Sequence, residues 1–177
     1  MSLLTTIKKT GRNLERAVSG AMRARAEGEM DILDKLKQEH EEAADLLAKL
    51  VDSHSASERK ALLKKIKGAL VPHLRAEEKV VYDAIIALKD KQVKQDGEEG
   101  YLEHGLADRM LATLSKITNA LSPEFSAAAK VLKELVEHHV EEEERDVWSD
   151  VRKNFSTEER VEMNRKFEAA KKKVRVA

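Results

Sequence analysis

The sequence contains no cysteine, only 2 prolines and 7 glycines among 177 residues, and just 3% aromatic side chains. The absence of cysteine excludes disulfides, thiolate zinc sites, iron–sulfur ligation, c-type haem attachment and a cysteine nucleophile. The scarcity of glycine and proline argues against short strands joined by tight turns and favours long helices. A core with few aromatics has to be built from aliphatic side chains. Any bound metal must be held by histidine and carboxylate groups.

Long apolar runs are also missing, since no stretch approaches the roughly 20 consecutive apolar residues that span a bilayer. We therefore expect a cytoplasmic protein. The formal net charge is zero, but residues 1–26 carry six basic side chains against Glu15 alone, and residues 156–177 carry seven basic and four acidic ones. The chain between them is acidic. Beyond this charge pattern, the sequence contains no nucleic-acid motif, phosphate loop, dinucleotide glycine pattern or Ser-His-Asp order.

Apolar residues that recur every three to four positions predict four long helices and a short fifth one. We expect the first helix to run from about Glu29 to Asp52. The segment Ser55-Ala56-Ser57-Glu58 has the form of a capping box and starts the second helix. Pro72 lies in the middle of this helix and predicts a kink or bulge, because proline donates no backbone hydrogen bond.

The later boundaries come from similar signals. A polar link is expected over Lys89–Asp96, and Asp96-Gly97-Glu98-Glu99 is interpreted as the start of the third helix. Ser122-Pro123 starts the fourth helix, with proline in the first helical position. Ser156-Thr157-Glu158-Glu159 starts the short basic helix near the C-terminus.

Four amphipathic helices joined by short connections favour an all-α, up-down-up-down antiparallel four-helix bundle. We assign residues 29–153 to this bundle. Residues 1–28 form a basic amphipathic N-terminal extension, and residues 154–177 form a basic C-terminal helix. The sequence does not decide between several roles for the basic terminal segments. These are a membrane-surface helix, an arm that binds a protein partner, a transit-like segment and simple docking on the bundle.

An internal repeat is the most informative feature of the chain. From His73 the sequence reads HLRAEEKVVYDAI, and from His139 it reads HVEEEERDVWSDV. Aligned without gaps, the segments match at His73/His139, Glu77/Glu143, Glu78/Glu144, Val81/Val147, Tyr82/Trp148 and Ile85/Val151. The preceding helices match as well, since His40 and His104 are each followed by Leu or Met at the same offsets. The sequence therefore contains the same helix pair twice.

The repeat brings histidine and glutamate to the inner faces of the helices. A histidine and a glutamate four residues apart lie on the same helix face, so their polar ends can converge. Burying two ionised glutamates without a cation would cost several kcal/mol per charge. Paired iron or manganese suits such a set, and zinc suits it less specifically. The predicted metal ligands are His40, His73, Glu77, His104, His139 and Glu143.

These residues and their doubled spacing resemble the hemerythrin-like, or HHE cation-binding, domain over roughly residues 29–153. The resemblance implies a non-haem di-iron centre in which the two glutamates bridge the irons and the histidines complete the ligand shells. It also implies reactivity with O2, peroxide or nitric oxide, or a role in sensing iron. Oxygen carriers of the family have a further histidine where this chain has Asp108. The chain is more similar to hemerythrin-like and iron–sulfur-centre repair proteins with four histidines and two glutamates.

Four further side chains are expected near the ligands. Glu78 and Glu144 each follow a predicted bridging glutamate, and they either support the site or pair with exposed basic residues. Tyr101 lies one turn before His104 and either lines the site or fills the core. Asp108 is either a weak ligand or leaves a coordination position open.

The two remaining histidines have simpler interpretations. His54 lies in a polar turn and is expected in solvent. His138 precedes His139 by one residue, about 100° around the helix, so it is interpreted as exposed or as a neighbour of the ligands. A rival register that pairs His138 with Glu142 would abandon the apolar stripe of the fourth helix.

The leading hypothesis is a di-iron protein that binds or reacts with a small oxidant, and whether it is an enzyme stays open. One alternative is an iron or oxygen sensor whose folding depends on metal. Another is an iron store or donor, including a role in iron–sulfur repair. A metal-free helical scaffold is the structural alternative.

Overall fold

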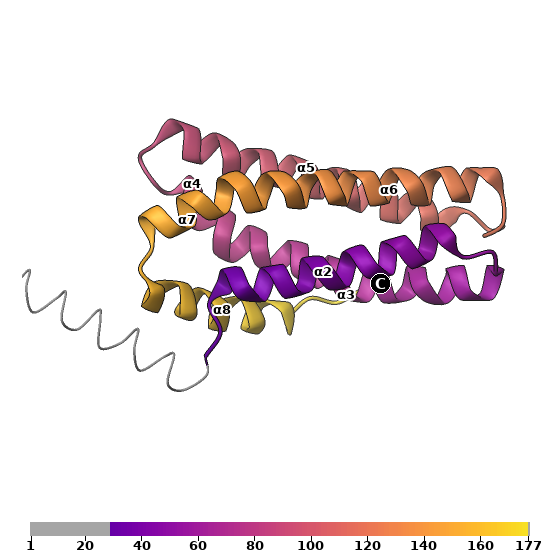
Figure 1. Ribbon diagram of the computed structural model, residues 1–177, viewed down its shortest axis with the longest axis horizontal. Coiled ribbons are helices and arrows are strands. Elements are labelled where there is room, and N and C mark those ends of the chain that lie inside the picture. Colours follow the sequence, from indigo (N-terminus) through magenta and orange to yellow (C-terminus); the bar gives the residue numbers. More distant parts are fainter. Residues whose placement is uncertain (1–28, 177) are drawn as a thin grey trace, which may run out of the picture.

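The computed structural model describes residues 29–176, and within this range it contains helices and no β-strand (Figure 1). The predicted all-α fold is therefore confirmed, while the predicted extension over residues 1–28 lies outside the described residues. The helical segments are α2 (Ile32–Asp52), α3 (Ala56–Glu77), η1 (Glu78–Tyr82), α4 (Asp83–Ile86), α5 (Lys91–Lys116), α6 (Pro123–Glu142), η2 (Glu143–Val147), α7 (Trp148–Asn154) and α8 (Thr157–Lys171).

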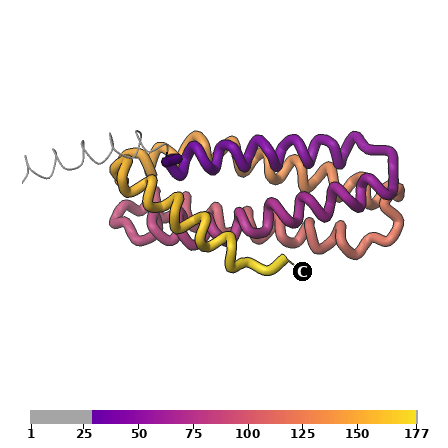
Figure 2. The backbone as a smooth tube through the Cα atoms, turned by 90° about the horizontal axis from the view of Figure 1, so that it is seen from below, coloured from indigo at the N-terminus to yellow at the C-terminus, as the bar shows by residue number. Residues whose placement is uncertain are grey.

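Four long rods make up the bundle, and successive rods run in opposite directions (Figures 1 and 2). The first rod is α2. The second consists of α3, η1 and α4 in direct succession, the third is α5, and the fourth consists of α6, η2 and α7. Short connections join the rods, which leaves each helix to pack against its predecessor.

Each long helix begins at a residue whose side-chain oxygen accepts a backbone hydrogen bond from the first turn. These residues are Asp31, Ser55, Asp90, Ser122 and Ser156. Ser156 and Glu159 form the complete capping box that the sequence predicts. The box predicted at Ser55 is only half formed, because the Glu58 carboxylate accepts a hydrogen bond from the Ser53 hydroxyl at 2.7 Å instead.

The prediction of a polar link over Lys89–Asp96 is wrong. The helix α5 already begins at Lys91, and Asp90 is its N-cap. Gly97, which was interpreted as part of a helix start, lies inside α5 against the preceding rod. A Cβ atom at this position would lie 2.7 Å from Cγ1 of Ile86. Glycine here permits a close approach of two helices, and its helix-breaking tendency is outweighed by that packing.

The expected irregularity in the second rod is present, but Pro72 does not explain it. Pro72 lies inside α3, and the π turn η1 follows further along the rod. A second π turn, η2, occurs in the fourth rod, where the repeat places His138 opposite Pro72. Both π turns adjoin the predicted ligands Glu77 and Glu143. Single π turns inside α-helices occur frequently at functional sites.

The interior consists of two apolar clusters with a polar layer between them. The cluster at the end where α2 meets α3 includes Leu47, Leu50, Ile66, Leu114, Phe125 and Leu132. The cluster at the opposite end includes Ile32, Leu36, Tyr82, Ile85, Trp148 and Phe167. The buried histidines and glutamates belong to neither cluster and lie on the same helices between them. Apolar packing on both sides therefore closes the bundle around a polar centre.

The C-terminal helix α8 docks on the bundle and crosses α2 and α3 (Figure 2). Its Phe167 is fully buried in the second apolar cluster. Arg160 pairs with the α2 N-cap Asp31 at 2.7 Å, and Lys171 pairs with Glu39 at 2.5 Å. Within the part of the chain that the structure describes, no helix has the length and apolar character needed to cross a membrane.

The close packing of Gly100 yields a stability test. A Cβ atom there would lie 2.5 Å from Cζ of Tyr82, which is fully buried and cannot move aside. We expect Gly100→Ala to lower the free energy of unfolding by about 1–3 kcal/mol through overpacking. Gly105→Ala is the control, because its nearest contact is Nη1 of Arg109 at 3.7 Å. It should raise stability by about 0.5–1 kcal/mol. Urea unfolding measures both, and equal stabilities would contradict the packing described.

Candidate metal centre

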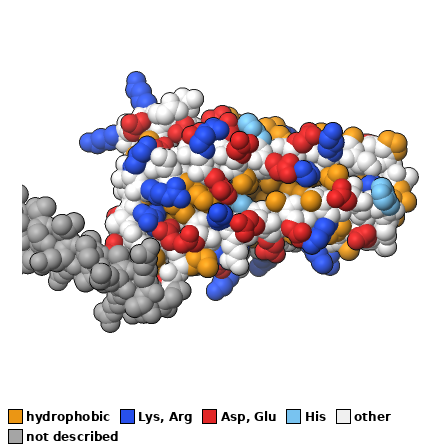
Figure 3. Space-filling view, viewed as in Figure 1, with side chains coloured by type: hydrophobic (Ala, Val, Ile, Leu, Met, Phe, Trp, Pro, Cys, Tyr) orange, Lys and Arg blue, Asp and Glu red, His pale blue; other side chains and the backbone are white. Residues whose placement is uncertain are grey.

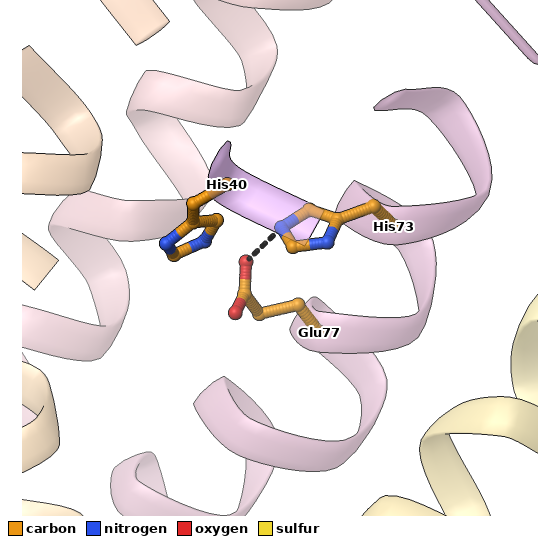
Figure 4. Close-up of side chains that lie close together, drawn as sticks. All are labelled: His40, His73 and Glu77. Atoms are coloured by element: carbon orange, nitrogen blue, oxygen red, sulfur yellow. Dashed lines mark ion pairs between the residues drawn. The ribbon is translucent and has the colours of Figure 1, made fainter. Parts of the chain in front are cut away.

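The six side chains predicted as ligands lie together in the polar layer, and all are buried. Each rod supplies one histidine, and the second and fourth rods supply one glutamate each. Figure 4 shows three of them, His40 from α2 with His73 and Glu77 from α3, pointing toward a common point. Helical spacing places the histidine and the glutamate of the same rod one turn apart on one face.

Glu77 lies between two groups of histidines. Its Oε2 atom is 3.3 Å from Nε2 of His73 and 3.5 Å from Nε2 of His104. Ligand atoms of Glu77, His40 and His73 lie within 4.8 Å of one another, and so do those of Glu77, His104 and His139. The carboxylate is therefore positioned to face two cations at once.

Glu143 mirrors this position from the fourth rod. Its Oε2 atom is 3.4 Å from Nε2 of His40 and 3.7 Å from Nε2 of His139. Like Glu77, it reaches one histidine of each half of the repeat. Nε2 atoms of all four histidines are therefore directed at the two carboxylates.

The two central carboxylates lack hydrogen-bond partners within residues 29–176. Neither oxygen of Glu77 nor of Glu143 accepts a hydrogen bond, although these residues are only 0% and 2% exposed. Nε2 of His40 is likewise without a hydrogen-bond partner in the described chain. Buried carboxylates are normally paired or hydrogen-bonded, because desolvating an ion is costly. The donor set, with imidazole nitrogens and carboxylate oxygens, fits divalent cations between these groups.

The outer nitrogen of every histidine in the centre hydrogen-bonds a second glutamate. The Nδ1 distances are 3.2 Å for His40 to Glu144, 3.1 Å for His73 to Glu39, 3.2 Å for His104 to Glu78 and 2.7 Å for His139 to Glu103. A carboxylate that accepts the Nδ1 proton fixes the ring orientation and leaves Nε2 free as a ligand. These four outer glutamates therefore orient the four imidazoles toward the centre.

Two of the outer glutamates were not expected from the sequence. Glu78 and Glu144 were candidates, whereas Glu39 and Glu103 were overlooked. The signal was present, because Glu39 precedes His40 and Glu103 precedes the equivalent histidine in the second half. Each half of the repeat thus contains a Glu-His pair followed by His-x-x-x-Glu-Glu.

The structure places Tyr101 and Asp108 away from the central carboxylates. The Tyr101 hydroxyl donates hydrogen bonds to the Glu78 backbone carbonyl at 3.1 Å and to the Asp83 carboxylate at 2.9 Å. The Asp108 carboxylate is partly exposed and pairs with Arg75, which also binds Glu78. Tyr101 therefore binds the backbone at Glu78, and Asp108 binds the arginine that pairs with Glu78. Neither side chain contacts the central carboxylates.

Aromatic side chains border the centre, and the sequence analysis did not place them there. Trp148 stacks on the His40 ring at 5.9 Å between centroids, and Phe167 of α8 meets the His73 ring edge-on at 5.7 Å. The Tyr82 hydroxyl lies 3.3 Å from Nε2 of His104. These rings limit how far the imidazoles can turn.

The centre without metal has an asymmetric distribution of protons. Burial lowers the pKa of His73, but the charge of Glu77 and the hydrogen bond that His73 donates to Glu39 outweigh this and raise it to about 9. Burial lowers the pKa of His40 to about 3, helped by the charge of His73. Burial raises the pKa of Glu77, but His73 and His104 reverse the shift and lower it. Burial and the charge of Glu77 raise the pKa of Glu143 well above its usual value.

A cavity of about 630 Å³ reaches the centre from the side of the first apolar cluster. All four histidine rings line it, together with aliphatic side chains such as Leu70, Ala107 and Val136. In the space-filling view, apolar side chains follow the seam between α2 and α6 (Figure 3). A small molecule therefore has space beside the imidazoles.

The family model "Hemerythrin HHE cation binding domain" matches residues 31–148, which is more than half of the chain. The chain belongs to this family of cation-binding helical domains. The matched range contains all six central side chains and ends within the fourth rod.

Among curated proteins, the chain is similar to one named "DNA nickase" from Nostoc sp. strain PCC 7120. The two are 27% identical over 146 residues, which cover 82% of this chain and 40% of the relative. The chain therefore spans well under half of that protein. No solved structure matches the chain.

The opposite pKa shifts of the two central glutamates yield a stability test on metal-free protein. The Glu143 carboxyl group stays protonated above its ordinary pKa, so its contribution to stability is lost as the pH rises through the raised value. At pH 7.5 we expect Glu143→Gln to raise the free energy of unfolding by about 1–3 kcal/mol. On folding, the glutamate either takes up a proton or is buried as an anion beside Glu77, and both cost free energy, whereas the neutral amide does neither.

Glu77→Gln is the matched substitution and should have the opposite effect. It removes the buried anion 3.3 Å from the protonated His73 and leaves Glu39 alone to balance that charge, which costs about 3 kcal/mol. Urea unfolding in the presence of a chelator measures both variants. Shifts of the same sign would contradict the assigned proton distribution.

Proposed function

We propose that this protein holds two iron ions in a non-haem centre and binds or reacts with a small oxidant there. The observation that carries the proposal is the position of Glu77 and Glu143. Each carboxylate lies between histidines of both halves of the repeat, is buried, and has no hydrogen-bond partner within residues 29–176. Two cations would balance these charges and use the directed Nε2 atoms as ligands.

The proposed ligand set divides between two cation positions. His40 and His73 would hold one ion, His104 and His139 the other, and the two glutamates would contact both. The grouping of ligand atoms within 4.8 Å around Glu77 supports this division. The outer glutamates keep the imidazoles oriented, and mutation of such supporting groups typically weakens metal binding 10–100-fold.

The cavity beside the histidines supports a small ligand. Its lining combines aliphatic side chains with the imidazoles and is large enough for O2, peroxide or nitric oxide. Iron held in the centre would supply the redox chemistry for such a ligand. The contribution of the chain is to keep the site apolar on one side and to place Tyr82 and Trp148 against the rings.

The proposal is tested by metal content. After iron-replete expression, we expect about two irons per chain together with a near-ultraviolet absorption band of oxo-bridged iron. His139→Ala should lower the content to about one or less, because one of the four histidine ligands is lost. His54→Ala is the control, since His54 is exposed and lies in the α2–α3 connection.

Metal analysis and absorption spectra on the same samples distinguish the outcomes. Less than one iron per chain in wild-type protein, without the band, would reject the proposed function. Equal iron content in the wild type and in His139→Ala would show that the metal is held elsewhere.

A further inference from the structure

A narrow acidic pocket connects the surface with the second half of the centre. It lies between α5 and the fourth rod and has a volume of about 50 Å³. Its carboxylates are Asp96, Glu99, Glu103, Glu142, Glu143 and Asp146. His139 also lines the pocket, so the acidic wall ends at two of the proposed ligands.

A second group of possible metal ligands adjoins this pocket, because two of its three members, Glu103 and Glu142, also line the pocket. Ligand atoms of Glu103, His138 and Glu142 lie within 4.8 Å of one another. Nε2 of the exposed His138 is 3.3 Å from Oε2 of Glu142, while the other oxygen of Glu142 faces Arg145 at 3.5 Å. One imidazole and two carboxylates form the mixed nitrogen and oxygen set that divalent transition metals accept.

Two contacts link this outer group to the interior. Glu103 accepts a hydrogen bond from Nδ1 of His139 at 2.7 Å, so one side chain serves both the outer group and the centre. Glu143 lines the same pocket, is 98% buried, and has no hydrogen-bond partner among residues 29–176. A buried carboxylate without a partner at the inner end of an acidic pocket points to a cation as the ligand.

The first half of the repeat lacks the acidic wall and the outer histidine at the equivalent positions. Ile32, Lys35, Ala76 and Val80 occupy the places of Asp96, Glu99, Glu142 and Asp146, and Pro72 occupies the place of His138. Glu39, the counterpart of Glu103, is bound by Lys35 and by Lys171 of α8. The repeat is therefore symmetric inside the bundle and asymmetric outside it. One side is closed by α8 and basic residues, and the other is open and acidic.

We propose that Glu103, His138 and Glu142 form a surface site that captures a divalent cation and delivers it through the acidic pocket to Glu143 and His139. This inference rests on the proposed two-iron centre. Clustered carboxylates raise the local cation concentration and can increase association rates by 10–10³-fold. Transfer inward exchanges three partly solvated ligands for the buried set, which binds more tightly because its glutamates lack other partners. The surface site thus binds the cation first, before the cation reaches the centre.

Loading kinetics test the capture site. Metal-free protein is mixed anaerobically with Fe²⁺ in stopped flow, and uptake is followed by competition with a chromogenic chelator. The His138→Ala, Glu142→Gln double variant should load about tenfold more slowly and still reach the wild-type iron content. His54→Ala, Glu141→Gln is the matched control, because it removes one exposed histidine and one exposed glutamate outside the pocket. It should load at the wild-type rate.

Equilibrium binding of Mn²⁺ provides an independent readout of the surface site. Wild-type protein should bind one weak equivalent beyond the tightly bound ions, and the double variant should lose it while the control retains it. Wild-type loading rates in the double variant would overturn the inference, and so would a reduced final iron content, which would assign these residues to the centre itself. Failure of the proposed function is distinguishable, because the wild type would then lack the two tight ions.

Discussion

Two buried carboxylates in the middle of a helical bundle are the constraint on which the rest of the structure depends. Glu77 and Glu143 are withdrawn from water and have no hydrogen-bond partner in the described chain, so their charge has to be balanced by protons or by cations. The apolar clusters at both ends of the bundle provide the packing that keeps the rods together around this unfavourable layer.

Two layers of contacts around the central carboxylates order the side chains of the site. The four imidazoles lie around the central carboxylates, and each imidazole is held from behind by an outer glutamate. Some of these outer contacts stay within one half of the repeat, as between Glu39 and His73, and others cross between halves, as between Glu78 and His104. The duplicated helix pair is therefore joined through the site as well as through apolar packing. The helix α8 adds to one half only, where Lys171 neutralises Glu39.

Much of this arrangement could be predicted from the sequence, because it depends on periodicity. The helical spacing of His73 with Glu77, repeated at His139 with Glu143, was enough to predict that these side chains converge. The start of α5 could not be read locally, since Gly97 looks like a helix-start signal and serves a close contact with Ile86. That contact is a property of tertiary packing.

The outer contacts were harder to predict for a different reason. The pairs Glu39-His40 and Glu103-His104 mark Glu39 as a residue of the site, but they do not reveal that it faces His73 from another rod. Asp108 was expected near the metal because it lies one turn after His104, but its carboxylate forms an ion pair with Arg75 at the surface. Pro72 is no general signal for the π turns, since it precedes only one of them.

Proton release on metal binding tests most directly whether cations replace protons in this centre. In the metal-free site His73, whose pKa is raised to about 9, holds a proton at neutral pH, and Glu143, whose pKa is raised by burial and by the charge of Glu77, holds its proton above the usual range of a carboxyl group. Metal has to displace both. Calorimetric titration with Fe²⁺ in buffers of different ionisation enthalpy should show release of at least one proton and an affinity that rises about tenfold per pH unit from about 6 to 8. An affinity independent of pH over this range, without proton release, would contradict the account.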